Sequence, residues 1–282
     1  MVAKQLMLQN IIMNVYHQIS RKDCLSHQLW PHFKKGWPES DKPVHFFWGL
    51  GDNQTEKIVE VSAKGEEWWY VDLGYITQQI TRYPSPIIHD YDKTYFRIVK
   101  GEIHTIRGRV GDGKRVLQLE HKGIDAKFKG WYTGPTEHIL LCPSSETVTR
   151  AIQHMGQQEW IDRTVVELKK YSKRKIIIRN KPRPGNEWWG KDIKEDLKNC
   201  HCLVTNMSLA AVDSVLNKVP IMTHDNNVAS PLSSGDPKFI EKPIRPGHKT
   251  VQGWLNFLAE NQFTISEIEN GTAYKTLMVQ DI

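Results

Sequence analysis

Short runs of β-branched and aromatic residues recur along this chain of 282 residues, and most are followed by a polar or glycine-containing loop and an amphipathic stretch. Apolar runs of this length, bounded by Gly or Asp, favour strands over helices. Strands that alternate with helices predict parallel βαβ units, because two parallel strands need a crossover long enough to contain a helix. The sequence therefore predicts an α/β fold.

The alternation can be followed in both halves of the chain. In the first half the predicted strands span 11–16, 44–48, 68–72 and 95–99, and a helix is predicted over 24–35. In the second half they span 139–142, 175–179, 202–205 and 219–223, with helices opening after 143–145 and over 157–171, 193–197 and 208–216. The run at 175–179 is apolar between basic ends, which is typical of a fully buried strand. The region from Trp254 to Ile268 predicts one or two packed helices.

The domain organisation follows from length and from a loop-rich seam. The length allows one large domain or two of about 140 residues each. Gly130, Gly134 and Pro135 cluster between the two series of strands. We therefore predict two Rossmann-like domains, one over 1–137 and one with C-terminal helices over 138–282.

The composition is that of a soluble globular protein. Hydrophobic residues make up 39% of the chain and the net charge is +6, which excludes a disordered chain and suits anionic partners. No apolar run reaches the roughly 18 residues that a membrane span needs, and the N-terminus has no signal-peptide pattern. The four cysteines lack zinc-ligand spacing and are expected to be buried thiols: Cys24, Cys142, Cys200 and Cys202.

Loops at the carboxyl ends of parallel strands are where α/β proteins bind ligands. The most informative one is 205–213, where Asn206 and Ser208 precede a helix rich in small residues. Free N–H groups at a helix start bind phosphate, and Asp213 lies where a carboxylate can accept hydrogen bonds from ribose hydroxyls. The alternative interpretation is an ordinary capped helix with a solvated Asp.

A second loop is strongly basic, because residues 169–183 contain eight basic and no acidic side chains. The lysines before the strand are expected to form a solvated face. Arg179 and Lys181 differ, since they follow the strand directly, where a pyrophosphate would lie. Arg suits bidentate phosphate binding, with Lys as a point charge. Ser144 and Ser145, which follow another predicted strand, could close the same site.

With these loops, residues 139–232 resemble the donor-binding half of a GT-B glycosyltransferase. The pieces that carry the resemblance are ILLCPSSE, KIIIRNKPRPG and CHCLVTNMSLAAVDSVLNKVPIMTHDNNVASPL. The pattern is similar to small bacteriophage glycosyltransferases that modify DNA bases. It implies two domains that face a cleft, an acceptor-binding domain over 1–137 and a donor-binding domain over 138–282. It also implies a nucleotide-sugar whose pyrophosphate and ribose are held by Ser144, Ser145, Arg179, Lys181, Asn206, Ser208 and Asp213.

Two residues depart from the pattern of that family. Asp213 stands where many relatives have Glu, which shifts the expected ribose contact, and Lys218 stands where a Gly commonly precedes Val-Pro. The chain also has no G-x-G-x-x-G and no G-K-[ST] motif. A dinucleotide oxidoreductase and a P-loop NTPase are therefore disfavoured.

Inverting transfer needs a base that takes the proton of the acceptor hydroxyl. Asp72, which ends a predicted strand, is the first candidate and His17 the second. Three further candidates lie on predicted loops: Asp52, Asp90 and His104. Each of them taken singly is more often a surface or structural residue. A retaining mechanism needs no such base, and neither mechanism requires a metal, because Arg and Lys can neutralise the leaving diphosphate.

The expected acceptor half contains a basic segment. Residues 97–129 hold nine basic and four acidic side chains, a pattern that suits DNA phosphates. The candidate nucleic-acid contacts are Arg97, Lys100, Arg107, Arg109, Lys114 and Arg115. The alternative is a solvated hairpin. The pairs Trp68-Trp69 and Trp188-Trp189 could instead stack on sugar rings, although most of the ten Trp are expected in the core.

We therefore expect a monomeric cytoplasmic glycosyltransferase, in the host cytoplasm if the chain is phage-encoded. It would move glucose or a pentose such as arabinose from a UDP-sugar to a hydroxylated or hydroxymethylated pyrimidine in double-stranded DNA. No tightly bound cofactor, metal or membrane enters this hypothesis. Two alternatives stay open: a glycosyltransferase of surface polysaccharide or lipopolysaccharide, and a non-catalytic α/β protein that binds nucleic acid.

Overall fold

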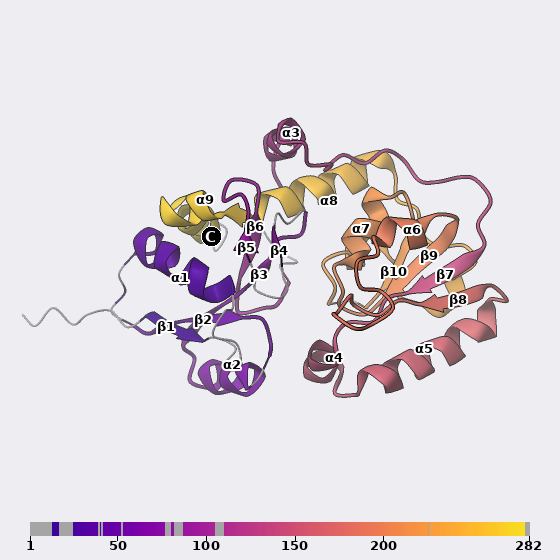
Figure 1. Ribbon diagram of the computed structural model, residues 1–282, viewed down its shortest axis with the longest axis horizontal. Coiled ribbons are helices and arrows are strands. Elements are labelled where there is room, and N and C mark those ends of the chain that lie inside the picture. Colours follow the sequence, from indigo (N-terminus) through magenta and orange to yellow (C-terminus); the bar gives the residue numbers. More distant parts are fainter. Residues whose placement is uncertain are drawn as a thin grey trace, which may run out of the picture. The chain divides into compact units, whose positions relative to one another are not determined.

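The computed structural model describes residues 13–16, 25–38, 40, 42–51, 53–76, 80–81, 87–104, 110–224 and 226–279. The chain forms two compact units (Figure 1). Unit 1 combines Met1–Leu73, Gln79–Ile103 and Phe263–Ile282, and unit 2 combines Gly74–Gln78 with His104–Gln262. This division differs from the predicted one at 137/138. Residues 104–137 belong to unit 2, and the C-terminal tail belongs to unit 1.

Unit 1 contains a five-stranded sheet with the order β1-β2-β3-β6-β11. Strands β1 to β3 run parallel, β6 is antiparallel to β3, and β11 is antiparallel to β6. Their bounds are β1 (Met13–Tyr16), β2 (Val44–Trp48), β3 (Glu67–Leu73), β6 (Tyr95–Lys100) and β11 (Phe263–Thr264). A separate ribbon pairs β4 (Ile80–Thr81) with β5 (Ile87–Ile88).

The prediction of parallel pairing throughout is wrong for β6. The described residues between β3 and β6 contain the β4–β5 ribbon and no helix. The observed return of β6 is antiparallel to β3, a pairing that needs no helical crossover. The strand β11 was not predicted, because two residues are too few to show an alternating pattern.

Aromatic rings fill the core of unit 1. Helices α1 (Leu25–Gly36), α9 (Ile265–Glu269) and α10 (Thr272–Val279) contribute to this core, and α2 (Gln54–Ala63) lies on the opposite side of β1 and β2 from α1 (Figure 1). Trp37 contacts Trp69 edge to face, with ring centroids 5.1 Å apart. Trp69 is 1% exposed. It is therefore a core residue, and the predicted sugar stacking by Trp69 does not fit its burial.

Unit 2 is built on a parallel sheet with the order β10-β9-β7-β8. The strands are β7 (His138–Leu141), β8 (Lys175–Ile178), β9 (Cys200–Thr205) and β10 (Ile221–Thr223). Helices α4 (Glu146–Gln153) and α5 (Gln157–Tyr171) lie on one side of it, and α6 (Ile193–Leu197) and α7 (Ala210–Leu216) lie on the other (Figure 1). The remaining elements are α3 (Lys114–His121), α8 (His248–Glu260) and two 3₁₀ turns, η1 (Ser230–Leu232) and η2 (Pro237–Phe239).

The strand order of unit 2 reverses between β7 and β9. From β7 the chain passes outward through α5 to β8, and from there it crosses to β9 and β10 on the other side of β7. A reversal of this kind separates the loops that follow the two central strands, and it is where open α/β sheets bind ligands. The α/β class that the sequence predicts is confirmed in both units.

The strand β8 is not buried as predicted. It is an edge strand with one neighbour, and Ile178 is 38% exposed. A continuous apolar run predicts that a strand is buried, but it does not show whether neighbouring strands flank it on one side or on both. The turn before β10 departs from the family pattern at Lys218, which adopts a φ of 67°. That left-handed conformation is the one for which a glycine is the usual residue.

The described cysteines, Cys142, Cys200 and Cys202, are free and buried, as the sequence predicts. Burial raises the pKa of the Cys142 thiol well above its ordinary value, and a thiol that stays protonated is a poor nucleophile. Cys24 lies outside the described residues. Within the described part of the chain, no helix combines the length and the apolar character that crossing a membrane requires.

Candidate functional site

The loops after β7 and β9 are joined by a buried hydrogen-bond network at the carboxyl edge of the unit 2 sheet. The Ser144 N–H donates to Asn206 Oδ1 at 2.8 Å, and the Met207 N–H donates to Ser144 Oγ at 3.0 Å. Ser144 and Asn206 are 5% and 1% exposed. Two of the predicted donor-binding residues are thus brought together exactly where the strand order reverses, although they lie 62 positions apart.

The side-chain amide of Asn206 also binds α4, the helix that follows the loop after β7. Its Nδ2 donates to Thr149 Oγ1 at 3.2 Å and to Gln153 Oε1 at 2.9 Å. Its backbone carbonyl accepts from Thr223 Oγ1 and from Asn227 Nδ2. Because every polar atom of this side chain is engaged, Asn206 holds the two loops in place rather than presenting a free group.

Two other predicted residues stand at the helix starts on this edge. Ser145 is the N-cap of α4 and is half-buried, and its side chain makes no capping hydrogen bond. Ser208 is half-buried too, and its Oγ accepts from the Ala210 N–H at the start of α7. Asp213 is exposed on α7. Ser145, Ser208 and Asp213 are therefore the predicted donor contacts that a solvent-borne ligand can reach.

Arg179 is placed differently from the sequence prediction. It follows β8, but its guanidinium is 4% exposed and forms an ion pair with Asp196 of α6. Its Nη2 donates to the Lys191 carbonyl at 2.7 Å, and the guanidinium carbon lies 5.1 Å from the centre of the Trp188 ring. The cation is committed to these internal partners, so the expected role as an open phosphate ligand is not supported. Lys181, two residues further on, is exposed.

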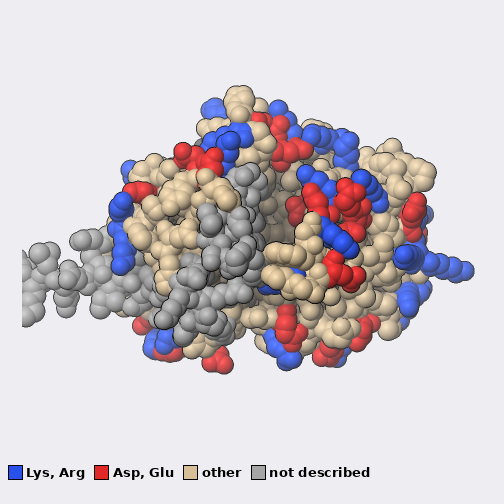
Figure 2. Space-filling model, in the orientation of Figure 1, with Lys and Arg blue, Asp and Glu red and all other residues tan. Residues whose placement is uncertain are grey.

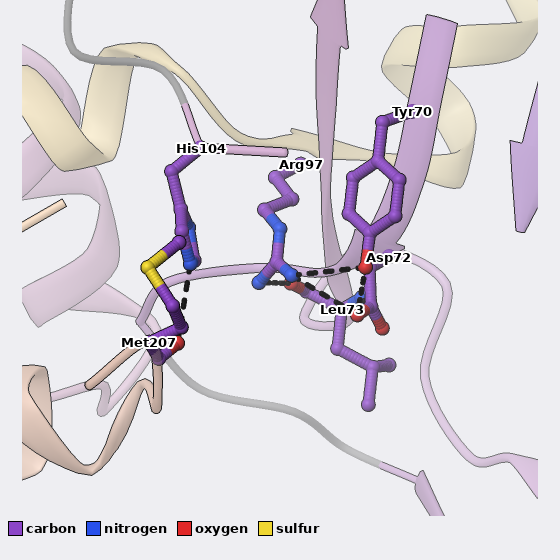
Figure 3. Close-up of polar contacts among 6 residues, drawn as sticks. All are labelled: Tyr70, Asp72, Leu73, Arg97, His104 and Met207. Atoms are coloured by element: carbon purple, nitrogen blue, oxygen red, sulfur yellow. Dashed lines mark hydrogen bonds and ion pairs between the residues drawn. The ribbon is translucent and has the colours of Figure 1, made fainter. Parts of the chain in front are cut away.

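In unit 1 the candidate base Asp72 lies opposite Arg97 across the β3–β6 pair (Figure 3). Arg97 Nη2 is 3.0 Å from Asp72 Oδ2, and Nη1 donates to the Leu73 carbonyl at 3.2 Å. The Tyr70 hydroxyl donates to the same Asp72 oxygen at 2.9 Å, and the Leu73 N–H donates to Oδ1 at 2.7 Å. Arg97 is buried, whereas the Asp72 side chain is 32% exposed. The carboxylate is thus held in one orientation with part of its surface open.

Tyr70 supports this arrangement. Burial raises the pKa of the Tyr70 phenol well above its ordinary value, and the negative charge of Asp72 raises it further. The phenol therefore stays protonated and acts as a hydrogen-bond donor to the carboxylate. Tyr70 is not among the site residues predicted from the sequence. The signal was available, because residues two apart on a strand point to the same face.

Two of the other candidate bases form hydrogen bonds within the protein, and two lie outside the residues that the structure describes. His104 of unit 2 is buried, and its Nε2 lies 3.2 Å from the Met207 carbonyl (Figure 3). Asp90 organises a turn, because its Oδ1 accepts from the N–H groups of the two residues at 92 and 93. His17 and Asp52 are not among the residues that the structure describes. Asp72 is thus the predicted base that a buried arginine and a buried tyrosine of the sheet hold with part of its carboxylate open.

The predicted nucleic-acid contacts divide into two kinds. Arg97 is buried in the pair described above. Arg115 donates from Nε to the Ala259 carbonyl at 2.8 Å and from Nη2 to the Gln262 carbonyl at 2.7 Å, so it stabilises the C-terminal end of α8. These two arginines do not form an open basic surface. The positive charge of a segment does not show whether its cations point outward.

Lys100 and Lys114 are exposed, and each has an acidic partner: Lys100 Nζ is 3.4 Å from Glu67, and Lys114 Nζ is 2.7 Å from Asp112. Arg107 and Arg109 fall in a stretch that the structure leaves undescribed. On the face seen in Figure 2, Lys and Arg side chains are interspersed with Asp and Glu. The described part of the basic segment therefore gives weaker support for DNA binding than its composition suggested.

Comparison with known protein families gives no match, and no curated protein matches the sequence. Among solved structures, the chain is similar to the β-Kdo 2,4-transferase of Thermosulfurimonas dismutans KpsC, with 10% identity, 87% of this chain and 90% of that chain covered, and a TM-score of 0.47. It is also similar to the β-Kdo 2,7-transferase of the same protein, with 10% identity, 94% and 99% covered, and a TM-score of 0.45. Because the identities and TM-scores of both matches are low, the assignment of the α/β fold class rests on the strands and helices described above.

Proposed function

We propose that this chain is a glycosyltransferase whose nucleotide-sugar donor binds at the carboxyl edge of the unit 2 sheet. One observation carries the proposal: the Ser144–Asn206 link fixes the loops after β7 and β9 where the strand order reverses. This edge also bears the reachable hydroxyls of Ser145 and Ser208. The resemblance of residues 139–232 to GT-B donor halves points to the same loops.

The residues on this edge have chemically distinct parts in the proposal. The Ser145 hydroxyl and the N–H groups at the start of α4 would donate to the diphosphate oxygens. Asp213 would accept hydrogen bonds from the ribose hydroxyls. Lys181 would supply positive charge to the leaving diphosphate. Arg179 does not have this role in the proposal, because its guanidinium is paired with Asp196. In an inverting reaction, Asp72 would take the proton of the acceptor hydroxyl.

The proposed acceptor is a saccharide of a surface polymer, with a hydroxylated or hydroxymethylated pyrimidine in DNA as the second candidate. The saccharide is favoured by a specific observation. Arg97 and Arg115, two of the six cations expected to face the DNA backbone, are engaged with internal carboxylate or carbonyl groups. The DNA acceptor then depends on Lys100, Lys114 and the undescribed Arg107 and Arg109.

Donor binding is expected to stabilise the folded protein. A ligand present at 100 times its Kd adds about 2.7 kcal/mol to the free energy of unfolding. The measurement is a thermal-shift series with UDP, GDP, CMP and UDP-sugars. We expect UDP and at least one UDP-sugar to raise the Tm. A series in which no nucleotide changes the Tm would contradict the transferase and leave the non-catalytic interpretation.

The two acceptors differ in product and in salt dependence. With a DNA acceptor, incubation with UDP-sugars gives a nucleoside that is heavier by one sugar, detected by mass spectrometry after digestion. DNA affinity should also fall steeply with salt, because each neutralised phosphate releases counterions. Transfer to oligosaccharides with no modified nucleoside and a shallow salt dependence would exclude DNA.

A further inference from the structure

The side chain of Gln54 is buried without a hydrogen-bond partner. It begins α2, is 2% exposed, and neither its Nε2 nor its Oε1 has a partner among the described residues. Buried amides are nearly always hydrogen-bonded, since leaving one unsatisfied destabilises the folded protein. An amide with two donors and an acceptor in this state indicates a missing partner.

The position of Gln54 directs its side chain to the carboxyl edge of the unit 1 sheet. Gln54 and Val61 are the buried residues of α2 and lie two turns apart, so they share the face that packs against β2 and β3. Gln54 is at the N-terminal end of that face. The chain reaches it from the end of β2 through Gly49, whose N–H donates to the Val71 carbonyl of β3 at 3.1 Å.

This edge is also the place of Asp72. The core residues Trp69 and Val71 point to the α1 side of the sheet, so Tyr70 and Asp72, which alternate with them, point to the other side. The helix α2 lies on that side (Figure 1). Gln54 and the partly open Asp72 therefore belong to the same face and the same edge of unit 1.

The surroundings favour an uncharged ligand. The described residues from Gly49 to Glu56 include no Lys or Arg, and their one charged side chain is the acidic Glu56. The N-cap residue Asn53 makes no side-chain capping bond. A phosphate here would find a helix start, but the cation on this edge, Arg97, is buried and already paired with Asp72. A hydroxyl group, which both donates and accepts, matches an amide that offers both functions.

We propose that Gln54 is a binding residue for a neutral sugar ring, whose hydroxyls complete the hydrogen bonds of its amide beside Asp72. This rests on the proposed function, in which Asp72 faces the acceptor, and it makes a saccharide rather than a nucleotide of DNA the occupant of the edge. Apart from its chain neighbours, no atom of the described residues lies within 4 Å of the position that a Cβ of Gly49 would take, so there is open space at Gly49.

The test measures ligand binding by the full chain, with saturation-transfer NMR on glucose, galactose, N-acetylglucosamine and ribose, and on 5-hydroxymethyl-2′-deoxycytidine as the nucleoside. We expect at least one sugar to bind the wild type and the control variant Gln118→Leu, which changes an exposed glutamine of α3. In Gln54→Leu, the affinity should fall at least about tenfold, as for a lost buried hydrogen bond. The Tm of Gln54→Leu should rise by about 2–4 °C, because the unsatisfied amide is gone.

Binding of the nucleoside alone, equal sugar binding by Gln54→Leu, or no sugar binding by the wild type would overturn the proposal. A crystal structure with sugar at saturating concentration that shows only a water on the amide would do so too. The UDP thermal shift of Gln54→Leu is measured in parallel. A retained UDP shift with no sugar binding defeats the Gln54 site alone, whereas loss of the UDP shift in the wild type defeats the transferase.

Discussion

Asp72→Asn is expected to lower kcat for sugar transfer by about 10²–10⁴-fold, the usual contribution of a general base. The affinity for the UDP-sugar should not change, because Asp72 is not among the residues proposed to hold the donor. The measurement is steady-state turnover with the donor and acceptor found in the screens, together with donor titration. Asn has the shape of Asp and cannot take up the proton.

The same substitution also removes the charge partner of a buried cation. Arg97 is 4% exposed, and an uncompensated buried charge destabilises a protein strongly. A loss of activity could then reflect a loss of folding. The double variant Asp72→Asn/Arg97→Met separates the two effects, since replacing both members of a buried pair with neutral groups restores much of the stability.

We expect the double variant to regain its Tm and to remain as inactive as Asp72→Asn. Tyr70→Phe is the milder comparison, because it removes one hydrogen bond to Asp72 and leaves the carboxylate charged. A double variant that turns over at the wild-type rate would show that Asp72 acts only as the partner of Arg97. The role of base would then pass to another group, with His17 the next candidate.

Asp196→Ala is expected to reduce the free energy of unfolding by about 3–5 kcal/mol, the range for breaking a buried ion pair. Arg179 keeps its bond to the Lys191 carbonyl and its contact with Trp188, but loses the carboxylate that neutralises it. Urea unfolding followed by circular dichroism gives the difference. The chain offers a matched control on the same helix, Glu195→Ala.

Glu195 pairs with Lys198, and both side chains are more than two-thirds exposed. Exposed pairs contribute at most about 1 kcal/mol, so Glu195→Ala should change stability little. Equal effects of the two substitutions would refute a buried Arg179–Asp196 pair. In the neutral double variant Arg179→Met/Asp196→Ala, unchanged UDP-sugar affinity would remove Arg179 from the donor site, whereas a weaker affinity would support its predicted role in donor binding.

Much of the chain's local structure could be read from its residues. Apolar runs bounded by Gly and Asp predicted β2 at Val44–Trp48, and amphipathic spacing predicted α5 at Gln157–Tyr171, with the observed bounds. The parallel sheet of unit 2 also follows from the alternation of strands and helices. These features depend on neighbours along the chain, so periodicity and turn residues suffice to find them.

The candidate site could be predicted only in part. The sequence predicted that Ser144 and Asn206 lie on loops at the carboxyl ends of strands, and in the structure these two loops meet. The sequence could not show that Asn206 would spend its hydrogen bonds on Thr149 and Gln153. Nor could it show that the buried amide of Gln54 would have no hydrogen-bond partner among the described residues. Both properties depend on residues of other elements that pack against the side chain.

The clearest division concerns the basic residues noted in the sequence. The sequence by itself determined that the chain is α/β, that it carries a net charge of +6, and where the cations lie along it. Only the tertiary structure decided which cations are available. Arg179 is buried against Asp196 and Arg97 against Asp72, and the half-buried Arg115 is hydrogen-bonded to the end of α8. The reason is physical: the environment of a charge is set by elements that pack against it, and β8, β6 and α3 acquire those neighbours only when the chain folds.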